Sequence, residues 1–394
     1  MTTGYPAALA GLPLGELAAP VAAVIDELRS GVLERERRGG APKEEVDALR
    51  GAGLLAGPWS REPGAPRWPD TLGAVAEIAT VDPSAAFLLG YHHMHVQLLA
   101  TSGTPAIEEW AVRGTLEHQW AWGGANNPSG EKVVVTEVDG GYRLTGSKEF
   151  ATGSLGADQL IVQEASPTAE SPLRRIALVV DAHAEGLTVL DDWDGIGVIR
   201  SATNRIRFED VFVPSDRFVR YSRTGTEHPL VAETASAPGF QILFANVYFG
   251  IALGALRRAY GYLHGDGGPR PHKRLGYSHV QETFGELLTA VSAARASVIE
   301  ADGVFERIVS RPASSVPAGE FQDMSRRVFE SKMFTHLTVM DVTQRVFDVT
   351  GSRGASTSTG LDKFWRDARN HTLHDDVRLR QRFIGALALG VDPA

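Results

Sequence analysis

The chain has 394 residues, more than one hydrophobic core usually serves, so we expect two or three subdomains. Its formal net charge of −9 and the lack of any Lys/Arg block argue against a nucleic-acid partner, and the absence of cysteine excludes disulfides, thiolate catalysis and cysteine-ligated zinc. The N-terminus lacks the basic region and long apolar core of a signal peptide, and no run of about 18 apolar residues predicts a membrane span. We therefore expect a soluble, cytoplasmic protein with no membrane partner.

The N-terminal part is predicted to be all helical. Apolar residues recur at helical spacing from about Leu14 to Gly57 and again from Asp70 to Ala100. A capping residue precedes proline at Asp82-Pro83 and at Thr104-Pro105, which is typical of a helix start. These patterns predict a helical domain over residues 1–115.

Strand patterns begin at about Gln119. KVVVTEV and YRLTGSKEF flank Asp139-Gly140-Gly141, which is a hairpin signal. Further strand-like runs are DQLIVQEA, RRIALVVDA, LTVLDDW and NRIRFEDVFVP. Short strands with turns every ~8–12 residues indicate a small β barrel or sandwich, which we assign to residues 116–235.

Helical periodicity returns at about Gly239 and continues to the end of the chain. Four long antiparallel helices are expected here, and they indicate a bundle over residues 236–394. Because helices and strands come in separate runs and do not alternate, the fold class is α+β. No GxGxxG follows a strand and no GxxxxGK[ST] occurs, so the usual dinucleotide and triphosphate loops are missing.

A polar loop, GSRGASTSTG, lies between the last two predicted helical segments. It holds one cation, Arg353, among hydroxyls and glycines, a composition that suits a phosphate group. His371 and His374 follow it, and a histidine beside a short loop suits proton transfer. The alternative is a polar connector between packed helices.

Five stretches carry a further signal through their order and spacing: LLGYHHMH, TGSKEFATGS, DDWDGIGVIRSATN, FANVYFGIALGAL and GSRGAS…LDKFWRDARNHTLHD. Together they resemble the acyl-CoA dehydrogenase superfamily over nearly the whole chain, and within it the flavin-dependent monooxygenases of the dibenzothiophene monooxygenase type. The resemblance implies an N-terminal helical domain, a small central β barrel and a C-terminal four-helix bundle that forms the core of a homotetramer.

The same resemblance implies a two-component reaction. Such enzymes take reduced FMN from a separate NAD(P)H-dependent flavin reductase and form a C4a-hydroperoxyflavin with O2. We therefore expect an enzyme that oxygenates a sulfur or nitrogen atom of a small, largely apolar substrate.

Cofactor-binding residues follow from the matched motifs. The resemblance places Phe150 and Thr152 against the isoalloxazine and Trp193 near the ring. It places Arg270, and Arg353 with Gly354 from a neighbouring subunit, on the FMN phosphate, for which the guanidinium fork is suited. Without the resemblance, these would be a strand pair, a buried tryptophan and solvated surface arginines.

The resemblance assigns the catalytic role to His92 and His374, which would keep the peroxide protonated and bind its distal oxygen. A neutral imidazole can donate or accept a hydrogen bond. A metal site is the alternative for the three close histidines, His92, His93 and His95. However, only His92 and His95 share a helix face, and no nearby carboxylate completes a ligand set. We therefore expect no metal. Which of the three histidines faces the flavin stays open.

Departures from the related families leave three alternatives. Asp375 stands where a dehydrogenase carries its glutamate base after the final loop, and Phe240 to Leu256 contains no acid. The segment WAWGGANNPSG lacks the TEPxxGSD sequence of acyl-CoA dehydrogenases and has Gly124 where sulfur-oxidising relatives have an asparagine. The alternatives are an FAD-dependent acyl-CoA dehydrogenase with Asp375 as base, an aromatic carbon hydroxylase of this fold, and a non-catalytic scaffold.

Overall fold

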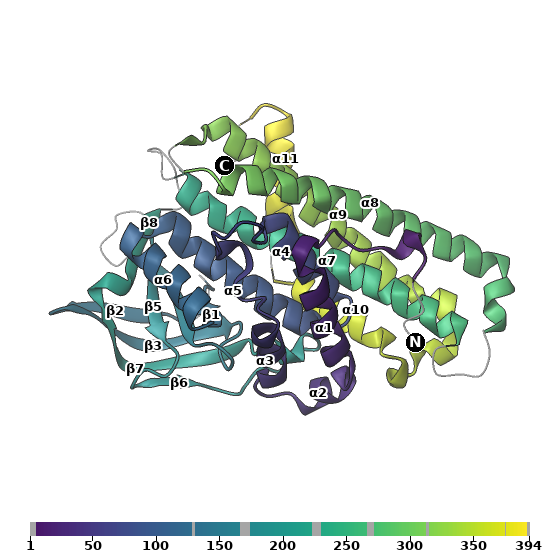
Figure 1. The fold of residues 1–394 in the computed structure, drawn as a ribbon, viewed down its shortest axis with the longest axis horizontal. Coiled ribbons are helices and arrows are strands. Elements are labelled where there is room, and N and C mark those ends of the chain that lie inside the picture. The colour runs from purple at the N-terminus through teal and green to yellow at the C-terminus, as the bar shows by residue number, and fades with distance from the viewer. Residues whose placement is uncertain are drawn as a thin grey trace.

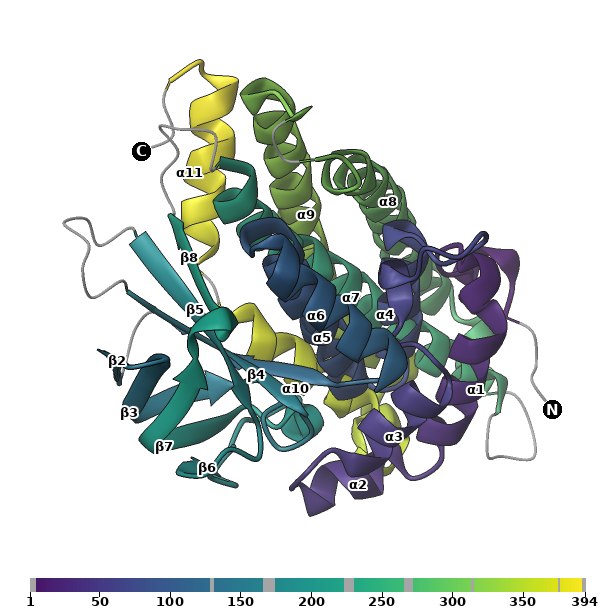
Figure 2. The ribbon, with the colours of Figure 1, turned by 60° about the vertical axis from the view of Figure 1, so that its left-hand side comes forward.

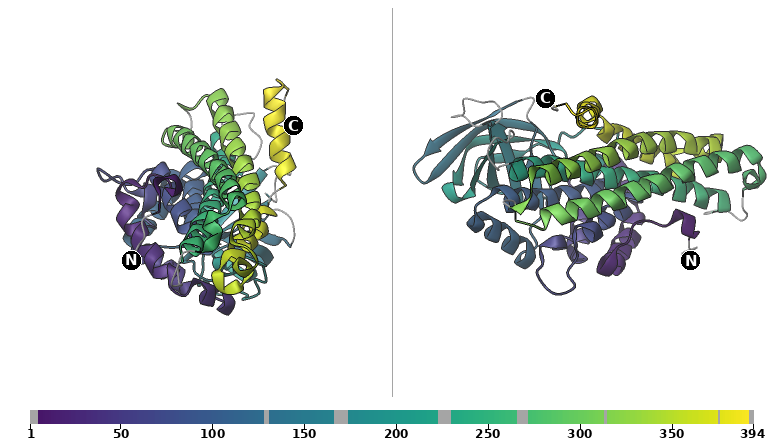
Figure 3. Two further views of the ribbon diagram at one scale, coloured as in Figure 1. Left: turned by 90° about the vertical axis from the view of Figure 1, so that its right-hand side faces the viewer. Right: turned by 90° about the horizontal axis from the view of Figure 1, so that it is seen from above.

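A computed structural model describes residues 5–127, 131–165, 174–222, 230–265, 272–312, 315–374 and 376–391. Helices come first, then strands, then long helices (Figure 1). The sheets lie at one end of an elongated molecule, and the long helices extend from them toward the other end (Figure 3). This order confirms the α+β class.

Two of the N-terminal helices begin where the sequence predicts, after Asp82 and after Thr104, whereas the stretch expected from about Leu14 to Gly57 is divided among three of them. The N-terminal helices are α1 (Ala18–Arg29), α2 (Val32–Arg38), α3 (Lys43–Gly51), α4 (Trp68–Ala79), α5 (Pro83–Ser102) and α6 (Pro105–Glu117). The Asp82 carboxylate accepts a hydrogen bond from the backbone N–H of Ala85, and Pro83 occupies the first turn of α5. Such a cap fixes the start of α5, the helix that carries the three clustered histidines.

The strands form two four-stranded sheets. One has the order β1 (Trp122–Ala125), β4 (Gln159–Ala165), β5 (Arg174–Asp181), β8 (Phe218–Ser222); the other has the order β2 (Val133–Val138), β3 (Gly141–Ala151), β7 (Asn204–Pro214), β6 (Leu187–Val189). The predicted hairpin is confirmed, since Val138 pairs with Gly141. Among the described residues, strand pairing does not close the sheets into the expected barrel.

Side-chain packing, not a continuous ladder, holds these sheets together. Inward-facing residues such as Leu144, Leu160 and Ile206 are completely buried in a shared apolar core. An isolated bridge between Gly124 and Thr152 connects the end of one sheet to the end of the other. The backbone of the two sheets therefore meets at Thr152, where a flavin contact is predicted.

The C-terminal part contains three long helices and two short ones in the described chain, where four long helices were expected. They are α7 (Leu230–His264), α8 (Ser278–Val309), α9 (Ala318–Thr350), α10 (Leu361–Thr372) and α11 (Val377–Ala388). The shorter α10 follows from two glycines in left-handed backbone, Gly351 (φ 75°) and Gly360 (φ 71°), which end α9 and delay the next helix. Figure 2 shows α7, α8 and α9 side by side, with α11 against α9.

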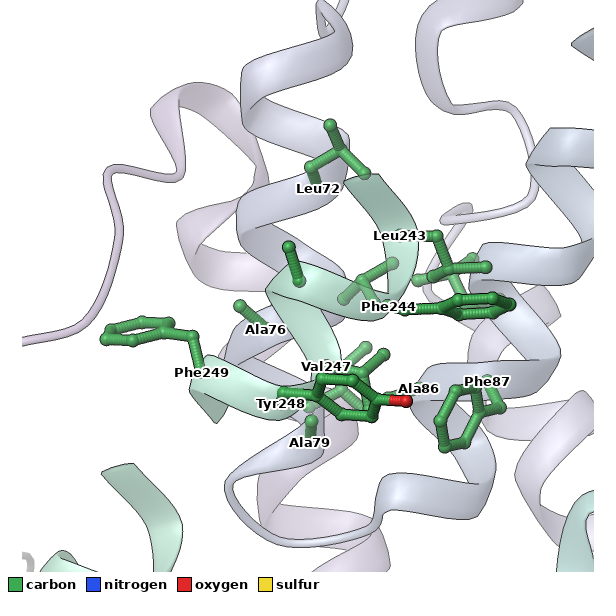
Figure 4. Close-up of a cluster of buried hydrophobic side chains, with 14 of the residues drawn as sticks. Leu72, Ala76, Ala79, Ala86, Phe87, Leu243, Phe244, Val247, Tyr248 and Phe249 are labelled. Atoms are coloured by element: carbon green, nitrogen blue, oxygen red, sulfur yellow. The ribbon is translucent and has the colours of Figure 1, made fainter. Parts of the chain in front are cut away.

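Helix α7 lies at the centre of the molecule. Its segment Pro238–His264 is long and apolar enough to cross a membrane, but 94% of its most apolar window is buried inside the protein, as in a core helix. Figure 4 shows Leu243, Phe244 and Val247 of α7 packed against α4 and α5. One continuous apolar core includes residues of the N-terminal helices and of α7 to α10. The boundaries proposed at residues 115 and 235 stay a prediction.

Candidate active site

The candidate site begins at Thr152, directly after β3. Its side chain is 7% exposed, and its hydroxyl lies 3.2 Å from that of Thr203, which in turn lies 2.7 Å from the Ser201 hydroxyl. The Thr152 side chain also hydrogen-bonds Tyr91 of α5, whose phenol pKa is raised well above its usual range by burial. A chain of hydroxyl groups therefore leads from the sheets to α5.

Phe150 and Trp193 lie together beside Thr152. Their ring centroids are 6.4 Å apart in an edge-to-face arrangement, and the Phe150 side chain remains 54% exposed. Phe150 adopts φ 58°, which is uncommon for an aromatic residue and turns its ring outward from the strand. The two rings present an apolar surface that is open to a planar ligand.

Asn204 holds the tryptophan loop in place. Its side-chain oxygen accepts hydrogen bonds from the backbone N–H groups of Asp192 (3.0 Å) and Trp193 (2.9 Å). The Trp193 indole N–H donates to the Val198 carbonyl at 3.1 Å. The sequence left Asn204 unassigned. A buried amide at the start of an apolar strand was the available signal, because such a group needs partners.

The loop after Trp193 is fixed to α10 by buried charge. The backbone N–H of Val198 donates to Asp367 at 2.6 Å, and the ammonium of Lys363 lies 2.6 Å from the same carboxylate and 3.3 Å from Glu36. Although burial opposes its charge, Asp367 and Glu36 raise the pKa of Lys363. Val198, a β-branched residue, adopts φ 46° here, so the loop is strained and depends on these partners.

A second buried network fixes the other end of that loop. Arg200 makes a bidentate pair with Glu45 (3.0 and 2.8 Å), and Glu45 also pairs with Arg35 at 3.1 Å. Arg35 reaches the Asp82 carboxylate at 3.3 Å. Arg200 precedes Ser201, so this network positions the hydroxyl chain against the N-terminal helices.

His92 and His93 are used by the fold. The His92 ring lies 2.9 Å from the Leu55 carbonyl through Nε2 and accepts from the Trp122 N–H at 3.3 Å through Nδ1. His93 is held in the same way by the Leu54 carbonyl and the Trp59 indole. Burial lowers the pKa of His92 to about 4, so both rings are neutral at pH 7. These contacts do not support the predicted catalytic role of His92, because both its ring nitrogens are occupied by backbone.

His95 is different from both. It is completely buried, and neither ring nitrogen has a hydrogen-bond partner in the described part of the chain. Its ring lies 6.0 Å from Tyr91 and 5.8 Å from Phe240, both in edge-to-face geometry. Of the three clustered histidines, His95 is therefore the one whose nitrogens face the interior next to Thr152.

His371 and His374 lie on the other side of the same aromatic wall. Their rings are parallel with centroids 5.2 Å apart, and Phe244 touches both, at 4.5 and 5.2 Å. The Tyr248 hydroxyl lies 2.9 Å from Nδ1 of His371, whereas Nε2 has no partner among the described residues. His374 is exposed and His371 buried, so the pair connects the surface with the interior.

The predicted phosphate residues do not join this group. The Arg353 side chain is exposed and makes no hydrogen bond or ion pair within the residues that the structure describes; Gly354 is buried against Thr350. Their loop follows the end of α9, at the end of the bundle remote from the sheets (Figure 1). Arg270 and Asp375 lie outside the described residues. Arg274, which the sequence did not single out, donates to the Val349 and Asp348 carbonyls and so holds the end of α9.

Within one chain the structure therefore brings Phe150, Thr152 and Trp193 together, and links them through Tyr91 and Phe244 to the His371–His374 pair. In the described ranges no cluster of three or more metal-ligating side chains occurs that could hold a metal ion. The site can hold a planar ring against Phe150 and Trp193, with buried imidazoles beyond it.

Comparison with known proteins identifies the class first. Residues 242–378 match the family model of the acyl-CoA dehydrogenase C-terminal domain. The butyryl-CoA dehydrogenase of Megasphaera elsdenii shares the fold, with a TM-score of 0.78 at 21% identity over 99% of this chain and 100% of that one.

Relatives then identify the family. The chain is 31% identical to a dibenzothiophene monooxygenase of Mycolicibacterium goodii over 380 residues, which cover 91% of this chain and 90% of that one. A crystal structure of TdsC from Paenibacillus sp. A11-2 with FMN and indole superposes with a TM-score of 0.85 at 29% identity, covering 95% and 97% of the two chains. The chain belongs to the dibenzothiophene monooxygenase family and is a flavin-dependent monooxygenase, as the resemblance predicted.

Proposed function

We propose that this protein is an FMNH2-dependent monooxygenase that oxygenates a sulfur or nitrogen atom of a small, largely apolar substrate. The observation that carries the proposal is the pairing of an open aromatic seat, Phe150 with Trp193, with a neighbouring wall of histidine and aromatic side chains. A planar redox cofactor fits the first, and an apolar substrate fits the second.

FMN suits the residues at the seat. Phe150 and Trp193 would pack on the isoalloxazine, and the Thr152 hydroxyl would hydrogen-bond it. Arg353 and Gly354, and Arg270 in the segment outside the described residues, would hold the phosphate of the FMN bound by a neighbouring subunit. The Arg353 side chain is exposed, and its loop lies at the end of the bundle remote from the sheets, which supports this division between chains. We further propose the homotetramer that the resemblance implies, with the C-terminal bundle as its core.

Bound reduced FMN would supply two electrons that activate O2 at the flavin C4a carbon. One oxygen atom would go to the substrate and the other would leave as water, so that electrons and atoms balance. His374, exposed and stacked on His371, would donate and take back the proton at the reacting oxygen. The Phe244 and Tyr91 side chains would exclude water from that oxygen.

Names of relatives support sulfur as the first atom to test. Besides the dibenzothiophene monooxygenases, the methanesulfinate monooxygenase MsuC of Pseudomonas fluorescens superposes with a TM-score of 0.84 at 26% identity, covering 94% of this chain and 96% of that one. We further propose that reduced FMN comes from a separate NAD(P)H-dependent flavin reductase in the cytoplasm.

The test is reconstitution with chemically reduced flavin. Purified protein is mixed anaerobically with photoreduced FMN and then with O2, and absorbance is followed by stopped flow in the presence of organic sulfides and amines. We expect a transient flavin–oxygen absorbance, followed by sulfoxide or hydroxylamine products detected by mass spectrometry. Reduced FAD in place of FMN is the cofactor control.

Three results would overturn the proposal. Tight FAD that bleaches on addition of an acyl-CoA indicates a dehydrogenase, for which Asp375 would be the base. No flavin binding and no transient indicates a non-catalytic scaffold, whereas oxygen placed on a ring carbon indicates an aromatic hydroxylase.

A further inference from the structure

His95 carries buried hydrogen-bonding capacity that the fold does not use. Its ring is 0% exposed, and both Nδ1 and Nε2 lack a partner within the described ranges. His92 and His93, in the preceding turn of the same helix, each have partners at both nitrogens. Because an unpaired buried polar group destabilises a fold, a ring left in this state points to a partner outside the chain.

The surroundings of the ring are aromatic side chains and peptide groups. Tyr91 and Phe240 meet it edge to face, and Phe244 continues the same wall toward His374. This wall offers faces and edges to a flat ligand, and it lies beside Thr152 at the proposed flavin seat. Contacts of this kind suit an uncharged aromatic compound.

Gly124 makes room for the imidazole. A Cβ atom at position 124 would lie 2.6 Å from Nε2 and 2.7 Å from Cε1 of His95, so any larger residue there would displace the ring. The Gly124 N–H donates to the Thr152 carbonyl at 3.1 Å, which ties this position to the end of β3. The His95 ring and the Ile161 carbonyl, which would lie 2.9 Å from that Cβ, together occupy the space that a side chain at position 124 would need, so the imidazole at position 95 requires a glycine at position 124.

We propose that His95 is a substrate-binding residue that hydrogen-bonds the single polar atom of a flat, uncharged aromatic substrate. The assignment rests on the proposed function for the position of the flavin. Burial lowers the pKa of His95 to about 3, so its ring is neutral at pH 7 and offers one donor and one acceptor. The substrate class is thus an arene or fused heterocycle with one N–H, O–H or acceptor atom.

Matched ligand pairs test this directly. Indole and benzothiophene have nearly the same shape, but only indole has an N–H donor; quinoline and naphthalene differ likewise in one acceptor. Isothermal titration calorimetry of the protein with oxidised FMN gives the dissociation constant of each. In His95→Phe we expect the preference within at least one pair to fall about 10-fold relative to wild type, the effect of one buried hydrogen bond.

Controls separate binding from folding and from catalysis. His95→Gln keeps a donor and an acceptor and should retain the preference, and His264→Phe, an exposed histidine at the end of α7, should not change it. His95→Met is the second apolar variant if His95→Phe does not fold. Unchanged ratios in both pairs, or no binding of any of the four ligands by wild type, would overturn the inference. Because these titrations involve no turnover, they stand apart from the oxygenation test of the proposed function.

Discussion

The Tyr248 hydroxyl lies 2.9 Å from Nδ1 of His371, in the interior between α7 and α10. His371 is stacked on His374 and on Phe87, so its orientation determines where the exposed imidazole of the pair lies. Burial lowers the pKa of His371 well below its usual value and keeps the ring neutral, so a hydrogen bond rather than a charge fixes its orientation.

Tyr248→Phe should therefore reduce the oxygenation rate more than it changes binding. Loss of one neutral orienting hydrogen bond is worth about 1 kcal/mol, so kcat should fall roughly 5- to 10-fold with a smaller change in KM. The measurement is product formation with saturating reduced FMN. Tyr260→Phe is the control: Tyr260 is another tyrosine of α7, its ring stacks on His264, and its loss should leave kcat unchanged. A large loss of melting temperature without loss of kcat would give Tyr248 a structural role only.

His92→Phe should destabilise the fold. The substitution leaves the Leu55 carbonyl and the Trp122 N–H without their ring partners in a fully buried place. Each unsatisfied group costs about 1–3 kcal/mol, so the urea midpoint should fall clearly, by the equivalent of roughly 2–4 kcal/mol. His95→Phe is the matched control and should melt at or above the wild-type temperature, because it removes unpaired polar atoms. If His92→Phe were as stable as wild type but inactive, the sequence-based role for His92 would be right.

These three histidines mark where sequence reasoning reached its limit. The pattern GYHHMH placed them on one helix, and the resemblance placed that helix at the flavin. Which ring turns toward the site depends on the segment Leu54–Leu55, whose carbonyls hydrogen-bond the rings of His92 and His93. Such a contact between parts of the chain 37 residues apart has no signature in local spacing.

A similar limit applies to the sheets. The hairpin of β2 and β3 was predictable, because Asp139-Gly140-Gly141 is local turn chemistry. The choice between barrel and sandwich depends on pairings such as β1 with β4 and β3 with β7, which local patterns do not encode. Asn204 and Arg274 were missed because they act on backbone groups of other segments.

Stability should fall in mild acid. The folded-state pKa is about 4 for His92, about 3 for His95 and well below 6.5 for His93 and His371, in each case because burial disfavours the charged ring. Between pH 6.5 and 5 the unfolded chain therefore binds more protons than the folded chain, and stability present at pH 7 is lost as the pH falls. Asp302, whose pKa burial raises, acts in the opposite direction.

Thermal melts at intervals from pH 7.5 to 5 measure this dependence. Replacing one buried histidine reduces the difference in bound protons between the unfolded and the folded chain by about one. The slope of the unfolding free energy with pH then falls by up to about 1.4 kcal/mol per pH unit. His95→Phe should therefore have a shallower decline than wild type in this range, whereas the exposed His264→Phe should follow wild type. Parallel curves for wild type and His95→Phe would mean that the buried ring titrates normally.

Phe150→Asn should separate cofactor binding from stability. Phe150 adopts φ 58° with its ring 54% exposed, and asparagine tolerates this left-handed conformation better than an aromatic residue does. The melting temperature without flavin should therefore stay the same or rise. FMN affinity, measured by quenching of flavin fluorescence, should fall about 5- to 10-fold, because one aromatic contact of about 1 kcal/mol is lost. Phe212→Asn, at another exposed phenylalanine of the sheets, should leave FMN affinity unchanged. Unaltered FMN affinity in Phe150→Asn would remove this residue from the seat.

Arg353 allows a test of whether one chain completes the site of another. Arg353→Glu places a negative charge where the phosphate is proposed and should abolish FMN binding by the homo-oligomer, while Phe150→Asp impairs the ring seat of its own chain. Neither variant alone should oxygenate substrate at a useful rate. If Arg353 serves a neighbour, co-expression of the two variants restores roughly a quarter of the sites, those that combine an intact seat with an intact arginine. If Arg353 served its own chain, every site would carry one defect and activity would stay absent. The measurement is oxygenation by co-purified, differently tagged chains, and Arg67→Glu, a charge reversal at another exposed arginine, is the control that should keep full activity.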